Sequence, residues 1–233
     1  MVPQLLCLPV LSQRMFYDTD FPADCHARGC PTLPIHSPWL IVVWCLAAYL
    51  LGSLATAIFV SRALRLPDPR RAGSNNPGAT NVLRLGGKKA AALTLLGDLL
   101  KGLLPVLAAR LVGFPAWGFA LVALATFLGH LYPLYFRFRG GKGVATTLGI
   151  LLALSPYLGL ASLAVWLLVF AASRVSSLAA LVATLSTPIF AWFLLPQESL
   201  RLLVIVLALW VLWRHRSNIR RLLGGKEAAL RKS

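Results

Sequence analysis

The sequence predicts an all-α membrane protein, a polytopic bundle of about seven transmembrane helices. Of its 233 residues, 58% are apolar and only 13% are charged, and the mean hydropathy is +0.74. A soluble domain has about 25% charged residues and about 45–50% apolar ones. So many apolar residues cannot all be buried in one core of this size, and lipid must therefore cover part of the surface.

Long apolar runs define the predicted helices, since a membrane span needs about 20 mostly apolar residues. The run after Gly143 is interrupted by Ser155–Pro156. A proline there ends one helix and begins the next, whereas a merged span of about 30 residues would be too long for the bilayer core. We expect helices over Trp39–Ser61, Ala90–Val112, Ala116–Tyr135, Val144–Leu154, Pro156–Ala172, Ser177–Leu195 and Leu200–Trp213.

The membrane domain is expected over residues 38–225. Residues 1–37 are predicted to be an irregular N-terminal extension that contains proline and cysteine, and residues 226–233 a short basic tail. A disulfide between Cys25 and Cys30 would require that the extension face an oxidising compartment, and the cysteine spacing fits no metal site. We assign no function to this extension.

The basic residues gather at one end of the predicted helices. Most of the 23 Lys and Arg residues follow the first, third, fifth and last helices, whereas the opposite connections are short and nearly uncharged. The positive-inside rule makes the basic side cytoplasmic, with the N-terminus outside and the C-terminus in the cytoplasm. Lipid headgroups and an anionic substrate explain the charge of +16. A nucleic-acid partner is not expected, because it would need a basic face on a soluble fold.

The loop between the first two predicted helices has the residues of an anion site. Gly and Asn tolerate positive φ, so the string Gly73–Asn81 can fold tightly with its backbone N–H groups directed at an anion. Arg84 can bind a phosphate through two hydrogen bonds. A solvated, turn-rich loop is the alternative. The candidate side-chain donors of the string are Ser74, Asn76, Thr80 and Asn81.

A second candidate is the glycine-rich segment before the predicted helix at residue 144, which resembles an anion cradle at a helix N-terminus. It is not a Walker A loop, because Phe136 stands where that motif has a glycine. A flexible basic turn is the alternative. His130, just upstream, is either an interfacial structural histidine or a general base. The residues of this cradle are Gly140, Gly141, Lys142 and Gly143.

Two shorter polar segments lie on the same predicted face. Arg174, Ser176 and Ser177 stand between two helices, where they can hold a phosphate or, in the case of Ser177, cap the next helix. After the last helix, Asn218 carries an amide that can donate to a developing oxyanion. A basic stop at the membrane surface is the simpler interpretation of that last segment.

Asp98 and Lys101 lie three residues apart in an otherwise apolar helix. They can pair with each other, and ionisable residues within a membrane indicate either a functional site or an ion pair that fixes helix packing. The sequence has no HExxH, no G-x-S-x-G and no carboxylate cluster for Mg²⁺. It therefore predicts a site for anion binding and positioning, with little machinery for covalent or metal catalysis.

Other function classes fit these features less well. A transporter for organic phosphates would need polar residues along a path to the outer face, and only Asp98 and Lys101 lie deep in the membrane. A non-catalytic subunit that binds anionic lipid would leave the Ser-, Asn- and Gly-rich segments without a role. A transferase of the CDP-alcohol type would need a helix with Mg²⁺-binding aspartates.

At these segments the sequence resembles the bacterial acyl-phosphate:glycerol-3-phosphate acyltransferase family of the PlsY type. One departure is Asn75, where the family usually has glycine, and asparagine is the next most tolerant residue of positive φ. The four motifs that carry the resemblance are GSNNPGATNVLR (Gly73–Arg84), GHLYPLYFRFRGGKGVAT (Gly129–Thr146), SRVSSLAAL (Ser173–Leu181) and RHRSNIRRLLGGKE (Arg214–Glu227).

The resemblance implies a seven-helix enzyme of the bacterial cytoplasmic (inner) membrane. Its reaction would transfer an acyl group from acyl phosphate to the 1-hydroxyl of glycerol 3-phosphate, which gives lysophosphatidate and phosphate in the first acylation step of phospholipid synthesis. The implied partners are both substrates, the bilayer and the enzyme that makes acyl phosphate. No metal or cofactor is implied. By this resemblance the phosphorylated substrates are held by Ser74, Arg84, Lys142, Ser176 and Ser177, and Asn218 helps to form the oxyanion hole.

Acyl phosphate is already an activated mixed anhydride, so such an enzyme has to orient its substrates more than it has to supply a nucleophile. Orientation can lower the barrier by up to about 7–11 kcal/mol. The leaving phosphate can itself accept the hydroxyl proton, which explains why no general base stands out. We expect Lys142, Ser177 and Asn218 to be the catalytic residues.

Overall fold

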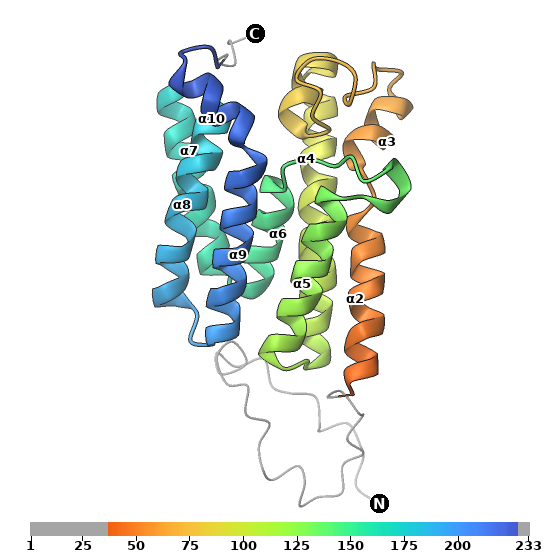
Figure 1. Ribbon diagram of the computed structural model, residues 1–233, viewed down its shortest axis with the longest axis vertical. Coiled ribbons are helices and arrows are strands. Elements are labelled where there is room, and N and C mark those ends of the chain that lie inside the picture. The colour runs from red at the N-terminus through yellow and green to blue at the C-terminus, as the bar shows by residue number, and fades with distance from the viewer. Residues whose placement is uncertain (1–36, 228–233) are drawn as a thin grey trace, which may run out of the picture. The chain divides into compact units, whose positions relative to one another are not determined.

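The computed structural model describes residues 37–227, and all regular structure within this range is helical. Predictions for residues 1–36 and 228–233, including the Cys25–Cys30 pair, lie outside the described residues. Figure 1 shows the α-helices. The elements are α2 (Pro38–Gly52), α3 (Thr56–Ala63), α4 (Ala79–Val112), α5 (Ala116–Leu131), the 3-10 turn η3 (Leu134–Phe136), α6 (Val144–Leu154), α7 (Pro156–Ser173), α8 (Ser176–Leu194), α9 (Glu198–Arg214) and α10 (Arg216–Leu223).

Several of these helices are long and apolar enough to cross a bilayer. Five stretches of the described chain meet this condition, and a sixth is obtained if α9 and α10, which are bent by 58°, are counted as one span. Helix α6 is apolar but has only 11 residues. Large side chains such as Leu168, Trp192 and Phe193 are exposed on the helix surfaces, where lipid would cover them. The prediction of an all-helical, multi-pass membrane protein is confirmed for the described residues.

The predicted helices agree with the observed ones to within a few residues, except at three places. The helix expected over Ala90–Val112 begins at Ala79, because a polar helical segment joins it at a kink where Gly87 has φ +76 and ψ −172. The helix expected over Trp39–Ser61 is broken into α2 and α3. Helix α10 is not predicted by apolar runs, since most of its eight residues are polar.

The break between α2 and α3 is stabilised by a buried ion pair on α4. The Lys101 ammonium donates to the Leu54 carbonyl oxygen at 2.8 Å and lies 2.9 Å from the Asp98 carboxylate. Within a bilayer, a carbonyl group that loses its helical partner must find a donor inside the protein. The predicted pairing of Asp98 with Lys101 is confirmed. The paired Lys101 ammonium also satisfies a backbone carbonyl group at the break.

Glycine residues bring two pairs of helices into close contact. A Cβ atom at Gly102 on α4 would lie 2.2 Å from the Thr146 carbonyl oxygen on α6, and one at Gly149 on α6 would lie 2.1 Å from the Leu99 carbonyl oxygen. The α2–α5 pair is built in the same way, with Gly52 directly against the α5 backbone. Small residues at such contacts let helices associate where lipid is as apolar as the interface.

Helix α6 ends among buried residues, where Arg110 satisfies its last carbonyl groups. The Arg110 guanidinium, from the final turn of α4, donates to the carbonyl oxygens of Ala153 and Leu154 at 2.9 and 3.0 Å. The chain is extended at Ser155, and Pro156 begins α7 at its first position, as the sequence predicts. A short helix can therefore end within the bundle without unpaired carbonyl groups.

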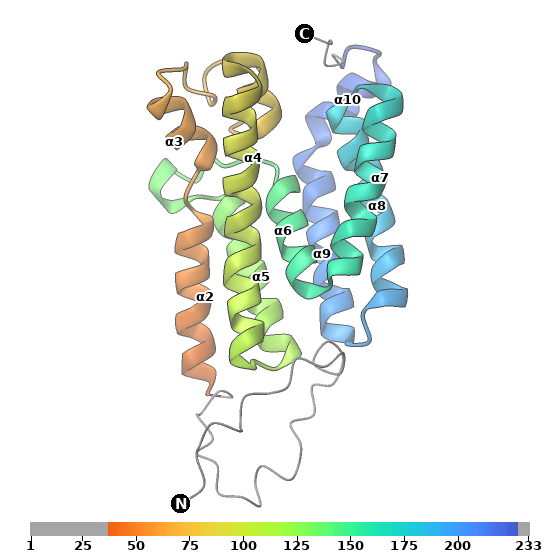
Figure 2. The same cartoon turned by 180° about the vertical axis from the view of Figure 1, so that it is seen from behind.

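The turns that carry the predicted site residues lie at one end of the bundle. Figures 1 and 2 show α10, the α7–α8 turn and the connection before α4 at this end, whereas the α4–α5, α6–α7 and α8–α9 turns lie at the other. Segments that are far apart in the sequence therefore meet in space.

We predict that Gly102→Ala destabilises the folded protein. The added methyl group would lie 2.2 Å from the Thr146 carbonyl oxygen, so α4 and α6 would have to move apart, and overpacking of this kind costs about 1–3 kcal/mol. Thermal unfolding in detergent measures the effect. Gly224→Ala is the matched control, because a Cβ atom there has only ordinary contacts. Equal melting temperatures for the two variants would contradict the prediction.

Candidate functional site

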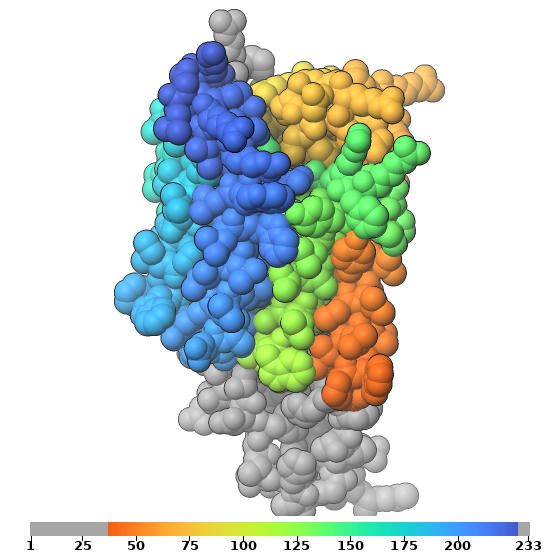
Figure 3. Space-filling model, viewed as in Figure 1, coloured from red at the N-terminus to blue at the C-terminus, as the bar shows by residue number. Residues whose placement is uncertain are grey.

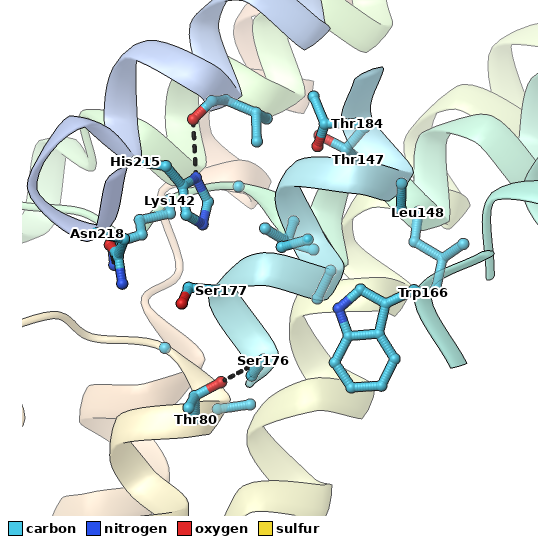
Figure 4. Close-up of a pocket in the computed structure, with 18 of the residues that line it drawn as sticks. Thr80, Lys142, Thr147, Leu148, Trp166, Ser176, Ser177, Thr184, His215 and Asn218 are labelled. Carbon is cyan, nitrogen blue, oxygen red and sulfur yellow. Dashed lines mark hydrogen bonds between the residues drawn. The ribbon is translucent and has the colours of Figure 1, made fainter. Parts of the chain in front are cut away.

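A cavity of about 720 Å³ lies between α4, α6, α7, α8 and α9. Part of its wall is polar and comes from the loop before α4, the glycine-rich loop before α6, the start of α8, and α10. The rest is apolar and includes Leu148, Leu163 and Trp166. Figure 4 shows this division, with Lys142 and Asn218 on one side and Leu148 and Trp166 on the other. The cavity suits a ligand that has a polar head and a long apolar tail.

The loop before α4 is held closed by Asn81. Its side-chain oxygen accepts a hydrogen bond from the Ser74 backbone N–H at 2.9 Å, and its side-chain nitrogen donates to the carbonyl oxygens of Pro69 and Ala72 at 3.0 Å each. Asn75 has φ +55, so the conformation expected for this position is confirmed. Because the Asn81 amide is used within the loop, its role as a phosphate ligand stays a prediction.

Thr80 and Ser176 connect two segments of the polar wall of the cavity. Their hydroxyl oxygens lie 3.1 Å apart, although the residues are 96 positions apart in the sequence, and Figure 4 shows this hydrogen bond. It joins the first turn of α4 to the first residue of α8. Ser176 begins α8 and no side chain caps that helix, so the alternative in which Ser177 is a helix cap is not observed.

The glycine-rich loop packs tightly against the end of α5. A Cβ atom at Gly140 would lie 2.1 Å from the His130 carbonyl oxygen, and one at Gly141 would lie 2.4 Å from the His130 Nε2 atom. Gly143 follows with φ +90 and directly precedes α6. The predicted arrangement of a glycine loop that precedes a helix is therefore confirmed. Gly140 and Gly141 are required because a side chain at either position would collide with His130.

His130 is buried beside the cavity. Its Nδ1 atom lies 3.0 Å from the Thr146 hydroxyl and 3.7 Å from the Asp98 carboxylate. Lys101 pairs with the same carboxylate, so a continuous polar contact runs from α4 through α5 to α6. Both interpretations of His130 stay predictions, because a carboxylate beside Nδ1 can fix helix packing and can also orient a histidine base.

Lys142 extends from the glycine-rich loop into the cavity and donates a hydrogen bond to the Asn218 side-chain oxygen. Burial, together with the positive charge of nearby Arg221, lowers the pKa of Lys142 from 10.5 to about 8, and the Glu227 carboxylate offsets only part of this effect. A partly buried ammonium among other cations is stabilised by a bound anion. An anion bound beside Lys142 would therefore keep its ammonium charged.

Arg214, at the end of α9, holds the glycine-rich loop in place. Its guanidinium donates to the Gly140 carbonyl oxygen at 2.9 Å and to the Gly141 carbonyl oxygen at 2.9 and 3.2 Å. It also lies over the Tyr132 ring, 5.9 Å from the centroid. Sequence reasoning missed Arg214, because a cation at a helix end is also what the positive-inside rule predicts.

The Glu227 carboxylate lies between α8 and α10. Its Oε1 atom accepts hydrogen bonds from the Ser177 hydroxyl at 2.7 Å and the Asn218 amide at 2.6 Å, and its Oε2 atom accepts one from Arg221 at 2.6 Å. Burial alone would raise the pKa of Glu227, but these hydrogen bonds outweigh it and hold the pKa below its usual range. A charged carboxylate thus fixes the position of the Asn218 amide.

Most of the predicted site residues line this one cavity. Arg174 does not, because it lies exposed at the α7–α8 turn with φ +58, and Gly140 and Gly141 are not among the lining residues. Sequence reasoning missed His215, Arg221 and Glu227, although the last motif contains them all. The predicted residues that line the cavity are Ser74, Asn76, Thr80, Asn81, Arg84, His130, Lys142, Gly143, Ser176, Ser177 and Asn218.

Residues 42–225 match the model of the glycerol-3-phosphate acyltransferase family. The chain belongs to this family. A glycerol-3-phosphate acyltransferase from Methylobacillus flagellatus is 58% identical over 190 residues, which cover 82% of this chain and 97% of the relative. One from Methylococcus capsulatus is 50% identical over 192 residues, which cover 82% of this chain and 96% of the relative.

Two crystal structures of PlsY (YgiH), an integral membrane glycerol 3-phosphate acyltransferase, have the same fold. The glycerol 3-phosphate form is 40% identical with a TM-score of 0.79, and the lysophosphatidic acid form is 39% identical with a TM-score of 0.76. Each match covers 82% of this chain and 96% of that structure. The family resemblance seen in the sequence is confirmed, and this family member is an acyltransferase that acts on glycerol 3-phosphate.

We predict that Arg214 is a positioning residue of this acyltransferase. In Arg214→Lys, one ammonium replaces a planar group that reaches two carbonyl oxygens, so the KM for glycerol 3-phosphate should rise roughly tenfold, the scale of one charged hydrogen bond. The melting temperature should stay within a few degrees. Arg139→Lys, an exposed cation next to the same loop, is the control. A change in melting temperature without a change in KM would contradict the prediction.

We also predict that acylation weakens as the pH rises through about 8. The free enzyme has a Lys142 pKa lowered to about 8, so its ammonium is lost above that pH and phosphate binding is lost with it. The profile of kcat/KM for glycerol 3-phosphate reports this ionisation. In Lys142→Arg the guanidinium stays charged, so the same decline should be absent. An unchanged decline in that variant would assign the ionisation to another group.

Proposed function

We propose that this glycerol-3-phosphate acyltransferase takes its acyl group from acyl phosphate and transfers it to the 1-hydroxyl of glycerol 3-phosphate. The products are lysophosphatidate and inorganic phosphate. One observation carries the proposal: a single cavity has a cationic polar part and a long apolar part. Acyl phosphate and lysophosphatidate both combine a phosphate with an acyl tail, so each matches the two parts of the wall.

The phosphate groups of the substrates bind at the polar part of the cavity. Arg84 and Lys142 supply positive charge there, and a guanidinium can bind a phosphate through two parallel hydrogen bonds. The solved PlsY form with glycerol 3-phosphate supports a head-group site in a protein of this fold. The donors expected to complete the site are Ser74, Asn76, Thr80, Ser176 and Ser177, which all line the cavity.

The acyl tail lies in the apolar part of the cavity, along the inner faces of α6 to α9. Leu148, Leu163 and Leu207 line this part, and burial of each methylene group contributes about 0.8 kcal/mol. The solved PlsY form with lysophosphatidic acid supports an acylated product in such a site.

Asn218 donates to the carbonyl oxygen of the donor as negative charge develops on it. Its amide nitrogen carries two hydrogens. One is donated to Glu227, and the other is available to an oxyanion. Because the Lys142 ammonium and Glu227 hold the amide group at both ends, it does not have to reorganise during the reaction. One such donor lowers the barrier by about 3 kcal/mol.

The proton of the attacking hydroxyl passes to the leaving phosphate. The hydroxyl oxygen bonds to the carbonyl carbon, the carbon–oxygen bond to phosphate breaks, and the phosphate leaves with that electron pair and accepts the proton. No protein base is required. This route agrees with the position of His130, whose Nδ1 atom faces Thr146 and Asp98.

In this proposal the chain crosses the bacterial cytoplasmic membrane seven times. Helix α6 is counted as the seventh crossing, although its 11 residues are short, because Arg110 satisfies its buried end. The N-terminus is outside, and the polar part of the cavity faces the cytoplasm, since most of the cations lie at that end. The enzyme that makes acyl phosphate would then be a partner on the cytoplasmic side.

Acyl transfer by the purified, detergent-solubilised protein tests the donor. Glycerol 3-phosphate is supplied with palmitoyl phosphate, palmitoyl-CoA or palmitoyl acyl carrier protein, with EDTA present, and lysophosphatidate is measured. We expect product from palmitoyl phosphate alone, and none from the Lys142→Ala variant. Product from a thioester alone would overturn the proposed donor. No product with any donor, from folded protein, would overturn the proposed reaction.

A further inference from the structure

A second, smaller cavity of about 250 Å³ opens beside the first, between the loop before α4 and helix α10. Figure 3 shows these two segments, in yellow and dark blue, at the same end of the bundle. All residues in the wall of this second cavity are of polar or charged types. Its residues are Ser74, Asn75, Asn76, Lys142, Arg214, Arg216, Ser217, Arg220 and Arg221.

The small cavity has a strong positive charge with no carboxylate in its wall. Arg221 is paired with Glu227, and Arg214 is bonded to the glycine-rich loop. The Arg220 side chain is exposed and forms no hydrogen bond or ion pair with any described residue, and the same holds for the Ser217 hydroxyl. These groups lie three residues apart on one face of α10, so both can reach the same anion.

The two cavities share part of their walls. Ser74, Asn76, Lys142 and Arg221 line both of them. An anion released beside Lys142 can therefore move to Arg220 while cations remain within reach. The apolar part of the larger cavity offers no comparable path, because leucine, alanine, valine and tryptophan side chains and a few hydroxyl groups line it and no lysine or arginine does.

We propose that the small basic cavity is a second phosphate site, which receives the inorganic phosphate released by acyl transfer. The proposal rests on acyl phosphate as the donor. The acceptor and the donor each bring a phosphate dianion into one site, and like charges at short distance repel each other. A separate set of cations lets the released phosphate move away from the phosphate of lysophosphatidate and towards water.

Inhibition by added inorganic phosphate tests this second site. In the double variant Ser217→Ala/Arg220→Gln, the inhibition constant for phosphate should rise about tenfold, the scale of one charged hydrogen bond, and by more than the KM for glycerol 3-phosphate. Arg139→Gln is the control, because this exposed cation lines neither cavity. An unchanged inhibition constant, or one that rises in step with KM, would overturn the proposal.

Equilibrium binding of labelled phosphate, without any acyl donor, separates this proposal from the choice of donor. In nanodiscs of zwitterionic lipid, the wild type should bind two phosphates per chain and the double variant one. This stoichiometry can be read even if a thioester proves to be the donor. One phosphate bound by both proteins would overturn the second site. Loss of the second phosphate when anionic lipid is added, in the wild type alone, would identify a lipid headgroup as the occupant instead.

Discussion

Backbone carbonyl groups at the breaks between helices need donors inside the protein, and cationic side chains supply them. Lys101 donates at the α2–α3 break, Arg110 at the end of α6, and Arg214 at the glycine-rich loop. In lipid, an unpaired carbonyl costs several kcal/mol. A long, flexible side chain with several N–H donors can reach such a group from a neighbouring helix. Of these three contacts, the one made by Arg214 holds a loop of the site, and the other two satisfy irregular backbone elsewhere in the bundle.

The same chemistry divides the cations into two groups. One group supports the fold through hydrogen bonds to backbone carbonyl groups or an ion pair with a buried carboxylate, and it comprises Lys101, Arg110 and Arg214. Arg84 and Lys142 line the cavity instead. Burial lowers the pKa of Lys142, because the ammonium loses hydration among other cations, and a bound anion would offset this loss. The affinity for an anion at Lys142 therefore depends on how Arg214 holds the glycine-rich loop.

Hydrogen bonds hold the groups that are expected to carry the reaction. Glu227 and Lys142 hold the Asn218 amide from its two ends, and Thr80 forms a hydrogen bond with Ser176 in the polar wall of the cavity. For a reactive donor, fixed geometry is the main contribution that an enzyme has to make. A site of this kind can accelerate acyl transfer without a strong nucleophile, provided that its donors do not move when charge develops.

Much of the site could be predicted from the sequence because its motifs are local. Positive φ at Asn75, the glycine loop before α6 and the Asp98–Lys101 pair each depend on residues that are close in the chain. The predicted helix boundaries were less accurate where a helical segment consists mostly of polar residues. Glu227 could not be assigned, because its partner Ser177 is 50 residues away and a charge near the end of a basic motif has no distinctive local pattern.

The sequence by itself determined the membrane class, the basic end of the helices and the residue types of an anion site. Apolar runs and the spacing of charges are one-dimensional signals, and a bilayer imposes few ways to satisfy them. Only the tertiary structure decided which cation supports the fold and which faces the cavity. Arg214 and Gly140 are 74 residues apart, and their contact depends on close helix packing, which no local pattern encodes.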